Sequence, residues 1–365
     1  MRVALVHDYL MQGMRGAERV LAIFHDLYPN APIYTLLHNP EKMGQATADW
    51  DIRTSFLQKI PGARRLHRRL FALMPLAVEL MNLRDYDLVI SASSAWVKNV
   101  RTPPGAVHIC YCYSPARFLW HWGDQYVSSL RAGPIARTLV RTTLPALRWW
   151  DRRGSSRVTE FVAISTTVRD RIRRYFNRDA RVIHPPVDTV RFQPVDDHDD
   201  YFLLVSTLNP YKCVDLAIEA FNRLALPLVV IGRGPEYERA EQLAGPTVKL
   251  LGWRDDEEVA WRMARCRAFV MPQEEDFGIA PLEAQSCGRP VIAYGAGGAL
   301  DSIIDRQTGL LFRPQSPEAL YRAVRRFEQM EFDEQACRQN ALQFSVDRFK
   351  RKFSSFVEKV WAEHK

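Results

Sequence analysis

Two glutamates, Glu275 and Glu283, stand on either side of the turn Phe277-Gly278. An apolar run, residues 268–271, comes before them, and Ala280-Pro281-Leu282 opens a predicted helix in which the proline suits the first turn. Backbone N–H groups in a glycine loop and at a helix start are available to an anion or to hydroxyl groups. Carboxylates accept hydrogen bonds from hydroxyls. The span therefore predicts a nucleotide-sugar site, and the alternative is a charged loop that only caps the helix.

Apolar runs alternate with stretches of helical periodicity along the 365 residues of the chain. The predicted strands are residues 2–7, 32–36, 87–91, 107–111, 161–164 and 181–183 in the first half, and 201–206, 228–231, 248–250, 268–271, 291–293 and 310–312 in the second. The predicted helices include residues 17–27, 168–176, 214–224, 257–265, 317–327 and 333–344. This order predicts an α/β fold with two parallel, Rossmann-like sheets, each covered by helices on both faces.

A change of composition separates the two predicted sheets. Paired prolines, Pro185-Pro186, and an acidic run at 196–200 are typical of a linker. We expect a first domain over residues 1–187, a linker over 188–200 and a second domain over 201–344, followed by a helix over 345–365 that packs back on the first domain. Because open α/β sheets bind ligands at the carboxyl ends of their strands, two facing domains would hold a substrate between them.

The composition is that of a folded protein with a basic surface: 47% of the residues are hydrophobic, 25% are charged and the net charge is +8. No run is long and apolar enough to cross a bilayer, and residues 1–8 indicate a first strand rather than a signal peptide. The six cysteines are dispersed, which is typical of a reduced, cytoplasmic protein.

The excess positive charge is concentrated in two segments, near residues 64–74 and 131–153, where arginines alternate with large apolar side chains. Such segments suit an interfacial helix on an anionic membrane surface, so we expect peripheral attachment at the inner face of the cell membrane. The alternative is a core-packing helix with a solvated basic face. No nucleic-acid module is present in the sequence, and we expect no nucleic-acid partner.

A metal site is not expected. Asp197-His198-Asp199 imitates a DxD metal motif, but it stands in the predicted linker without a flanking apolar strand. The nine histidines form no HExxH or comparable pattern.

Several blocks of the chain resemble the retaining glycosyltransferases of GT-B fold, in the large family that contains bacterial O-antigen and exopolysaccharide α-mannosyltransferases (glycosyltransferase family 4, group 1). The strongest block is residues 275–293; the others are "LLVSTLNPYKCVDLAIEAF" at 203–221, "VIHPPVDTVRF" at 182–192, "HICYCYSPARFLW" at 108–120 and the opening "HDYLMQGMRGAERVL". The resemblance covers nearly the whole chain and implies two Rossmann-like domains facing across a cleft.

The resemblance also implies roles for single residues. Glu283 would bind the ribose of the nucleotide-sugar, and Glu275 would face the sugar ring. Backbone N–H groups for the sugar hydroxyls and the diphosphate would come from Phe277, Gly278 and Ile279. Lys212 would neutralise the leaving diphosphate, where a fixed ammonium acts most strongly in the transition state; the alternative is an exposed lysine at a helix start. Gly16 would belong to an opening loop near the donor phosphates or the acceptor.

At three positions this chain departs from the family pattern. Thr207 stands where the family usually has an arginine, so a second cation for the phosphates would come from Arg233, Arg254 or Arg15. Arg15 itself replaces one of two glycines in the opening loop. Tyr113 stands where a histidine often contacts the donor sugar near the reacting carbon; its hydroxyl can donate or accept a hydrogen bond but is less suited to proton transfer near neutral pH.

The resemblance implies transfer of a hexose, with retained configuration, to a saccharide acceptor carried on a polyprenyl diphosphate in surface polysaccharide synthesis. Because the blocks "YCYSPARFLW" and "PPVD" are most similar to mannosyltransferases, the expected donor is GDP-mannose. The nucleotide-sugar is a co-substrate, and no other cofactor is expected. The alternatives are the same fold with a UDP-sugar or GDP-fucose donor, or a degenerate GT-B protein that binds without catalysis.

Overall fold

The computed structural model describes residues 1–66, 70–121 and 134–364. The chain forms two compact units: unit 1 contains residues 1–183 and 350–365, and unit 2 contains residues 184–349. The chain therefore leaves unit 1 after residue 183 and returns to it at residue 350. The segment 188–200, expected as a linker, lies inside unit 2.

Unit 1 is built on a seven-stranded parallel sheet with the strand order β3-β2-β1-β4-β5-β6-β7. Its strands are β1 (Val3–Leu10), β2 (Ile33–His38), β3 (Ile52–Thr54), β4 (Leu88–Ser93), β5 (Val107–Cys112), β6 (Glu160–Ala163) and β7 (Ala180–Val182). Six of the seven were predicted, and β3 was missed. Strands β4 and β5 are buried along their whole length, which agrees with a sheet covered on both faces.

The helices of unit 1 include several short ones, with 3-10 helices labelled η. They are α1 (Gly16–Leu27), α2 (Pro40–Met43), η1 (Gly44–Thr47), η2 (Phe56–Lys59), α3 (Ala63–Leu66), η4 (Phe71–Leu73), α4 (Met74–Glu79), η5 (Val97–Asn99), α5 (Arg117–Trp120), α7 (Pro134–Ser155), α8 (Thr166–Phe176) and α16 (Val346–His364). On one face, side chains of β1, β2 and β4 pack with those of η2, α4, η5, α5 and α7 in a single core.

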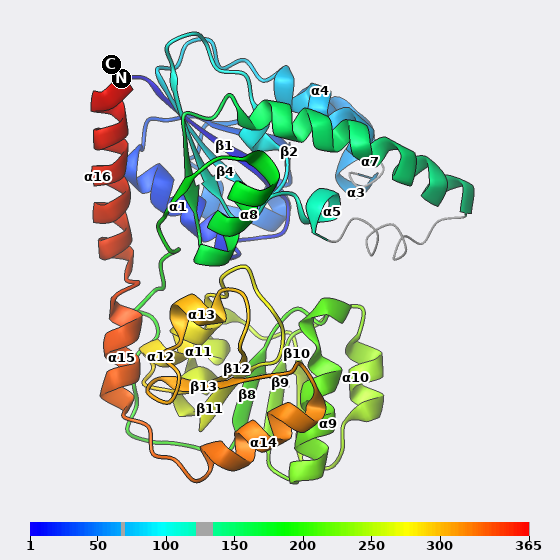
Figure 1. The fold of residues 1–365 in the computed structure, drawn as a ribbon, viewed down its shortest axis with the longest axis vertical. Helices are drawn as coiled ribbons and strands as arrows, with labels where there is room; N and C mark the ends of the chain where they lie inside the picture. The colour runs from blue at the N-terminus through cyan, green and yellow to red at the C-terminus, as the bar shows by residue number, and fades with distance from the viewer. Residues whose placement is uncertain (67–69, 122–133, 365) are drawn as a thin grey trace. The chain divides into compact units, whose positions relative to one another are not determined.

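The C-terminal helix α16 packs on unit 1, as predicted. It runs alongside α1 (Figure 1), and the ring of Phe353 lies 4.5 Å from the ring of Phe24 on α1. The Tyr111 ring, on β5, is 6.1 Å from Phe353, and Lys350 forms an ion pair with Asp26 at 3.0 Å. Residues far apart in the sequence thus complete one hydrophobic layer.

Unit 2 is built on a six-stranded parallel sheet with the order β10-β9-β8-β11-β12-β13. The strands are β8 (Phe202–Val205), β9 (Leu228–Ile231), β10 (Val248–Gly252), β11 (Ala268–Met271), β12 (Val291–Tyr294) and β13 (Gly309–Phe312). All six were predicted. They alternate with the helices η6 (Pro210–Lys212), α9 (Val214–Leu224), α10 (Tyr237–Leu243), α11 (Asp256–Arg265), α12 (Ala280–Ser286), α13 (Ala299–Ser302), α14 (Pro317–Phe327) and α15 (Glu334–Leu342).

Two hydrophobic cores lie on the two faces of this sheet. Helices α9, α10 and α14 cover one face, and α11, α12 and α13 cover the other (Figure 1). Capping residues begin several of these helices: the Asp255 side chain accepts from the Glu258 N–H at 2.8 Å, and the Ser316 hydroxyl accepts from the Ala319 N–H at 3.2 Å. The predicted fold class, two Rossmann-like parallel sheets with helices on both faces, is confirmed.

Candidate functional site

The strand order of unit 2 creates a switch point between β8 and β11. From β8 the chain moves outward to β9 and β10, and from β11 it moves outward in the opposite direction to β12 and β13. Open α/β sheets bind ligands at such a point, outside the carboxyl ends of the strands. Lys212 follows β8 in η6, and Glu275 follows β11. The topology therefore brings these two predicted site residues to one edge of the sheet.

Lys212 and Glu275 are in direct contact. The ammonium of Lys212 is ion-paired with Oε1 of Glu275, and the same oxygen accepts a hydrogen bond from Nε2 of Gln273 at 3.1 Å. Each side chain of the pair is 14% exposed, so both groups are largely shielded but reachable. The arrangement offers a cation to an anionic ligand and a carboxylate oxygen to hydroxyl groups. Sequence reasoning missed Gln273, which has no motif of its own.

The loop that carries Lys212 is held by local backbone geometry. Cys213 has a φ of +50°, which turns the chain from η6 into α9, and the Lys212 N–H donates to the Asn209 carbonyl at 2.9 Å. Nε2 of Gln315 donates to the Pro272 carbonyl at 2.9 Å and contacts the Cys213 Sγ at 3.4 Å. Gln315 thus links the loop after β8 to the loop after β11.

The loop that carries Glu275 is held by the glycines after β12. The Gly298 N–H donates to the Glu275 carbonyl at 2.8 Å. A Cβ atom at Gly298 would lie 2.1 Å from the Phe277 Cα, and Gly297 has a φ of +61°. Only glycine permits this approach of the two backbones. The glycine segment 295–298 therefore sets the position of the site loop.

Phe277 is buried, and its ring stacks on the His184 ring with centroids 5.2 Å apart. Its side chain anchors the site loop, and its backbone lies against Gly298. Gly278, with a φ of +82°, and Ile279 then lead into α12, whose first N–H groups are not used within the helix. Glu283 lies half-buried in the first turn of α12. His184 was not given a role by the sequence reasoning.

Thr207 lies exposed in the loop after β8, where its hydroxyl accepts from Nδ2 of Asn209 at 3.2 Å. Three cations were considered in its place, and two of them, Arg233 and Arg254, belong to unit 2. Arg254 is ion-paired with Glu258 at 2.9 Å. The Arg233 carbonyl accepts from the Leu208 N–H at 3.1 Å, so Arg233 lies beside the Thr207 loop. Its guanidinium lies over the ring of Tyr237, 4.9 Å from the centroid.

The remaining predicted site residues belong to unit 1. Gly16 is the first residue of α1, and Arg15, directly before it, is exposed. The Tyr113 hydroxyl donates to the Ala17 carbonyl at 2.9 Å, at the start of the same helix. Burial raises the pKa of Tyr113 well above its ordinary value, and the charge of Glu18 acts in the same direction. Tyr113 therefore keeps its proton and ties the end of β5 to α1.

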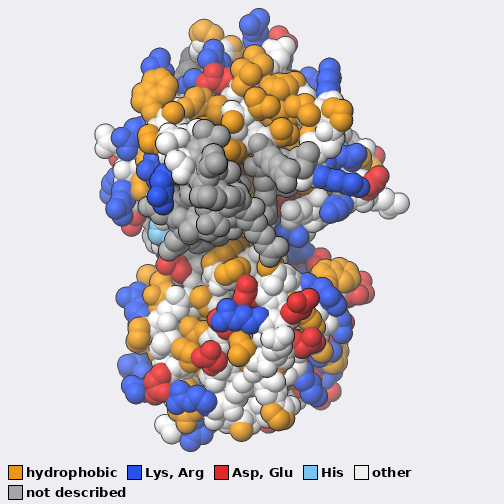
Figure 2. Space-filling model, turned by 90° about the vertical axis from the view of Figure 1, so that its right-hand side faces the viewer, with side chains coloured by type: hydrophobic (Ala, Val, Ile, Leu, Met, Phe, Trp, Pro, Cys, Tyr) orange, Lys and Arg blue, Asp and Glu red, His pale blue; other side chains and the backbone are white. Residues whose placement is uncertain are grey.

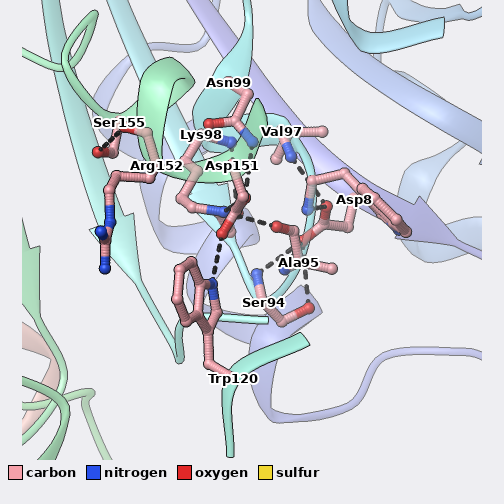
Figure 3. Close-up of polar contacts among 12 residues, drawn as sticks. Asp8, Ser94, Ala95, Val97, Lys98, Asn99, Trp120, Asp151, Arg152 and Ser155 are labelled. Carbon is pink, nitrogen blue, oxygen red and sulfur yellow. Dashed lines mark hydrogen bonds and ion pairs between the residues drawn. The ribbon is translucent and has the colours of Figure 1, made fainter. Parts of the chain in front are cut away.

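Unit 1 has its own switch point, between β1 and β4, and the carboxylate of Asp8 occupies it. Asp8 is 1% exposed and accepts hydrogen bonds from four successive backbone N–H groups (Figure 3). Their donors are Ser94 at 2.6 Å, Ala95 at 2.9 Å, Trp96 at 2.8 Å and Val97 at 3.1 Å. These backbone donors are thus satisfied internally, whereas the switch point of unit 2 presents Lys212 and Glu275. Sequence reasoning missed the role of Asp8.

A buried ion pair lies next to Asp8. Lys98, in η5, and Asp151, in α7, are in contact and wholly buried (Figure 3). The second Asp151 oxygen accepts from Nε1 of Trp120 at 2.8 Å, and Lys98 also donates to the Ala95 carbonyl at 2.8 Å. Because every charge is paired inside the core, this network fixes η5 and α5 against α7.

The DxD-like segment has ordinary contacts. Nε2 of His198 lies 3.0 Å from the Val195 carbonyl and 2.6 Å from the guanidinium of Arg289. Within residues 1–66, 70–121 and 134–364, no group of three or more His, Cys, Asp or Glu side chains is arranged to hold a metal ion.

Comparison with known proteins places this geometry in a class. Residues 188–344, nearly all of unit 2, match the model of the family described as glycosyl transferases group 1. The crystal structure of Anabaena HepE in complex with UDP superposes with a TM-score of 0.72 at 16% identity, covering 98% of this chain and 100% of that one. The chain therefore has the GT-B fold, and its residues 188–344 match the group 1 glycosyltransferase family.

Two glycosyltransferases each match more than half of the chain. An uncharacterized glycosyltransferase of Methanocaldococcus jannaschii is 26% identical over 221 residues, which cover 59% of this chain and 63% of that protein. A GDP-mannose-dependent alpha-(1-6)-phosphatidylinositol monomannoside mannosyltransferase of Mycolicibacterium smegmatis is 30% identical over 235 residues, which cover 53% of this chain and 61% of that protein. The match spans less than two thirds of the length of either relative.

Proposed function

We propose that this protein transfers a hexose from a nucleoside diphosphate sugar to a saccharide acceptor, with retained anomeric configuration. The observation that carries the proposal is the Lys212–Glu275 pair at the β8/β11 switch point, inside the segment that matches group 1 glycosyltransferases. A diphosphate needs a fixed cation as it leaves, and a sugar ring needs oriented acceptors for its hydroxyls.

Each group at the site has a proposed task. Lys212 binds the diphosphate, and the charge of the ligand then competes with Glu275 for the ammonium. Glu275, still held by Gln273, accepts from hydroxyls of the donor sugar. The backbone of Gly278 and Ile279 binds the diphosphate or sugar hydroxyls, and Glu283 binds the ribose. Arg233 supplies the second cation for the diphosphate, because the uncharged Thr207 cannot.

In the proposed reaction the acceptor oxygen attacks the anomeric carbon from the side of the departing diphosphate. The C–O bond to the diphosphate breaks as the new glycosidic bond forms, and the acceptor proton passes to a diphosphate oxygen. This route needs no enzymic nucleophile. It also gives Tyr113 no proton-transfer role, in agreement with its raised pKa and its hydrogen bond to Ala17.

GDP-mannose is the proposed donor. The support is that the mycobacterial relative is GDP-mannose-dependent, whereas the structural neighbour HepE was solved with UDP. A thermal-shift panel separates the two, because a ligand that binds the folded state raises its stability, by about 2.7 kcal/mol at 100 times the Kd. Selective stabilisation by GDP-mannose supports the proposal. Selective stabilisation by UDP-sugars would show that the donor is a UDP-sugar instead.

The proposed acceptor is an oligosaccharide on a polyprenyl diphosphate, reached at the inner face of the cell membrane. Within the described residues no helix is long and apolar enough to cross a membrane. Exposed apolar side chains of unit 1 include Leu73, Leu76, Leu80 and Trp149, and Figure 2 shows hydrophobic side chains gathered on one face of unit 1 beside Lys and Arg. These segments support peripheral contact. Arg68, Arg69 and Arg131 of the predicted basic segments lie outside the described residues.

Replacing Lys212 tests the proposed chemistry. We expect Lys212→Gln to lower the transfer rate by roughly 10²- to 10³-fold, the usual loss when one stabilising group at a developing charge is removed. Lys249→Gln is the matched control, because Lys249 is exposed on β10 of the same unit. Rates are measured as GDP release with saturating acceptor. Equal rates for the Lys212→Gln and Lys249→Gln proteins would contradict the proposal, and donor binding without any turnover in the wild type would favour the non-catalytic alternative.

A further inference from the structure

Three aromatic rings from distant parts of unit 2 meet at the site loop, residues 272–279, which joins β11 to α12. Phe277 belongs to the loop itself, His184 is the first residue of the unit, and Phe344 lies just after α15. The His184 and Phe277 rings are nearly parallel, with an interplanar angle of 17° and centroids 5.2 Å apart. Phe344 lies 5.4 Å from His184 and 6.0 Å from Phe277, so each ring contacts the other two.

The two rings outside the loop are joined through their backbones. The Val187 N–H donates to the Phe344 carbonyl at 2.8 Å. Between His184 and Val187 stand two buried prolines, Pro185-Pro186. A proline fixes its own φ and restricts the residue before it to extended conformations. The entry segment, residues 184–187, therefore presents the His184 ring on a stiff backbone.

An arginine ties the chain just after the entry segment to α12. Arg338, on α15, donates to the Thr189 carbonyl at 3.0 Å and to the Phe192 carbonyl at 2.6 Å. It also donates at 2.9 Å to the hydroxyl of Ser286, the last residue of α12. Because α12 begins directly after the site loop, the stretch of chain that enters unit 2 supports the loop in two ways, through the Phe277 ring and through the helix.

The position of Phe277 decides where the polar groups of the site lie. Phe277 is 2% exposed, and it stands two residues after Glu275 and directly before Gly278. Gly278 has a φ of +82°, and a Cβ atom there would lie 3.4 Å from the Glu275 Cβ, so the loop folds closely over this glutamate. A shift of the Phe277 ring therefore changes where Glu275 meets Lys212.

We infer that His184 is a positioning residue of the donor site. Its ring, stacked on Phe277, holds the site loop where Glu275 pairs with Lys212. The effect on the loop follows from contacts within unit 2, and the effect on the donor rests on the proposed transfer reaction. If the ring only filled space, its loss would lower stability without changing the loop or the use of the donor.

The loop is tested first, without any donor. The Gly298 N–H donates to the Glu275 carbonyl, so its hydrogen exchange reports the position of the site loop. We expect His184→Ala to speed exchange at Gly298 roughly three- to tenfold, the factor that an aromatic contact of this kind contributes. His184→Phe, which keeps a flat ring, exchanges like the wild type. Unchanged exchange in His184→Ala, or equally fast exchange in His184→Phe, overturns the inference.

Phe332→Ala is the matched control. The Phe332 ring is also partly buried, and it stacks on Phe327 at 5.1 Å with the same interplanar angle of 17°. Phe327 packs beside Phe202 at the amino end of β8, whereas the site lies beyond the carboxyl ends of the strands. We expect this variant to lose stability towards urea and to keep the wild-type exchange at Gly298. Equal acceleration at Gly298 in Phe332→Ala and His184→Ala would reflect a general loss of stability and overturns the inference.

Use of the donor is tested second, with GDP-mannose. We expect His184→Ala to lower kcat/KM for the donor by roughly 10- to 10²-fold, because a small displacement of positioning groups has effects of that size, and to leave KM for the acceptor unchanged. His184→Phe restores the donor value, and Phe332→Ala keeps it. Wild-type kcat/KM for the donor in His184→Ala, or an equal rise of both KM values, contradicts a role at the donor site.

Failure of the proposed reaction gives a different pattern of results. A protein without transfer, in which exchange at Gly298 still depends on His184, leaves the positioning of the loop standing and contradicts only the reaction. Active transfer, with exchange at Gly298 independent of His184, leaves the reaction standing and overturns the inference.

Discussion

Tyr113 illustrates how the surroundings of a residue decide its chemistry. In isolation a phenol beside a predicted cleft can act as a hydrogen-bond partner for a substrate. Here its hydroxyl is taken by the Ala17 carbonyl at 2.9 Å, and burial raises its pKa well above the ordinary value. The side chain therefore links the end of β5 to the first turn of α1, where Ala17 directly follows Gly16.

The substitution Tyr113→Phe distinguishes a structural role of this residue from a catalytic role. We expect the free energy of unfolding to fall by about 1 kcal/mol, the usual contribution of one hydrogen bond, and the transfer rate to change little. The folded tyrosine resists ionisation, so the wild type loses stability as pH rises above about 10, where the unfolded chain ionises. The stability difference between the two proteins therefore narrows at high pH. Urea unfolding at several pH values measures this.

Tyr175→Phe serves as the control, because the Tyr175 hydroxyl makes no hydrogen bond within the described part of the chain. A fall in transfer of roughly 10²-fold or more for Tyr113→Phe, with unchanged stability, would instead assign proton transfer to Tyr113.

The positions of residues that directly follow strands could be predicted from the sequence, and contacts that depend on distant partners could not. Glu275 and Lys212 follow strands in recognisable loops, and the parallel sheet brings them together. Asp8 looks like one more strand residue until β4 lies beside β1 and places four N–H groups around its carboxylate. The ring of His184 stacks on that of Phe277, which lies 93 residues further along the chain. No sequence spacing predicts such a contact.

At the scale of elements, regular apolar runs predicted the strands, and the strand without such a run was missed. All strands of unit 2 were predicted because each is a buried apolar stretch between loops. Strand β3, Ile52–Thr54, has a half-buried isoleucine and two exposed residues, so its sequence shows no run at all. Strand β1 extends to Leu10, beyond the predicted end at His7, because His7 and Asp8 are buried by partners elsewhere in unit 1.

The loop between β12 and α13 acts on the site through its glycines. Gly298→Ala would bring a Cβ to 2.1 Å from the Phe277 Cα, so the two backbones must separate. We expect the free energy of unfolding to fall by about 1–3 kcal/mol and the transfer rate to fall by roughly 10²-fold, since a small displacement of positioning groups has effects of that size. Urea unfolding measures the first effect, and the transfer assay measures the second.

Gly295→Ala, in the same loop, is the matched control. The added Cβ would be nearest to the Arg313 Nε at 3.2 Å, and that side chain can move. A Gly298→Ala protein as active and stable as Gly295→Ala would show that the loop after β12 does not position Glu275.

At the scale of the whole molecule, unit 1 is discontinuous in sequence. Phe353 of α16 is completely buried, and its ring contacts that of Phe24 on α1. We expect Phe353→Ala to lower the free energy of unfolding of unit 1 by about 3–5 kcal/mol, the usual cost of such a cavity. Hydrogen exchange of amides in α1 and β5 becomes faster, and exchange in unit 2 stays as it was.

Lys352→Ala is the control, because Lys352 is the exposed neighbour of Phe353 on the same helix. Faster exchange throughout unit 2 in the Phe353→Ala protein would mean that the two units unfold as one, contrary to this expectation.

The return of α16 to unit 1 also sets an order of events during synthesis. The ribosome delivers the seven strands of unit 1 first, then all of unit 2, and only then the helix that covers Phe24 and Tyr111. Unit 2 can reach its final structure while unit 1 still exposes an apolar surface. The nascent chain therefore completes unit 2 before unit 1, although unit 1 begins the sequence. In this interval the rings of Phe24 and Tyr111 lack the cover that Phe353 gives them in the folded protein.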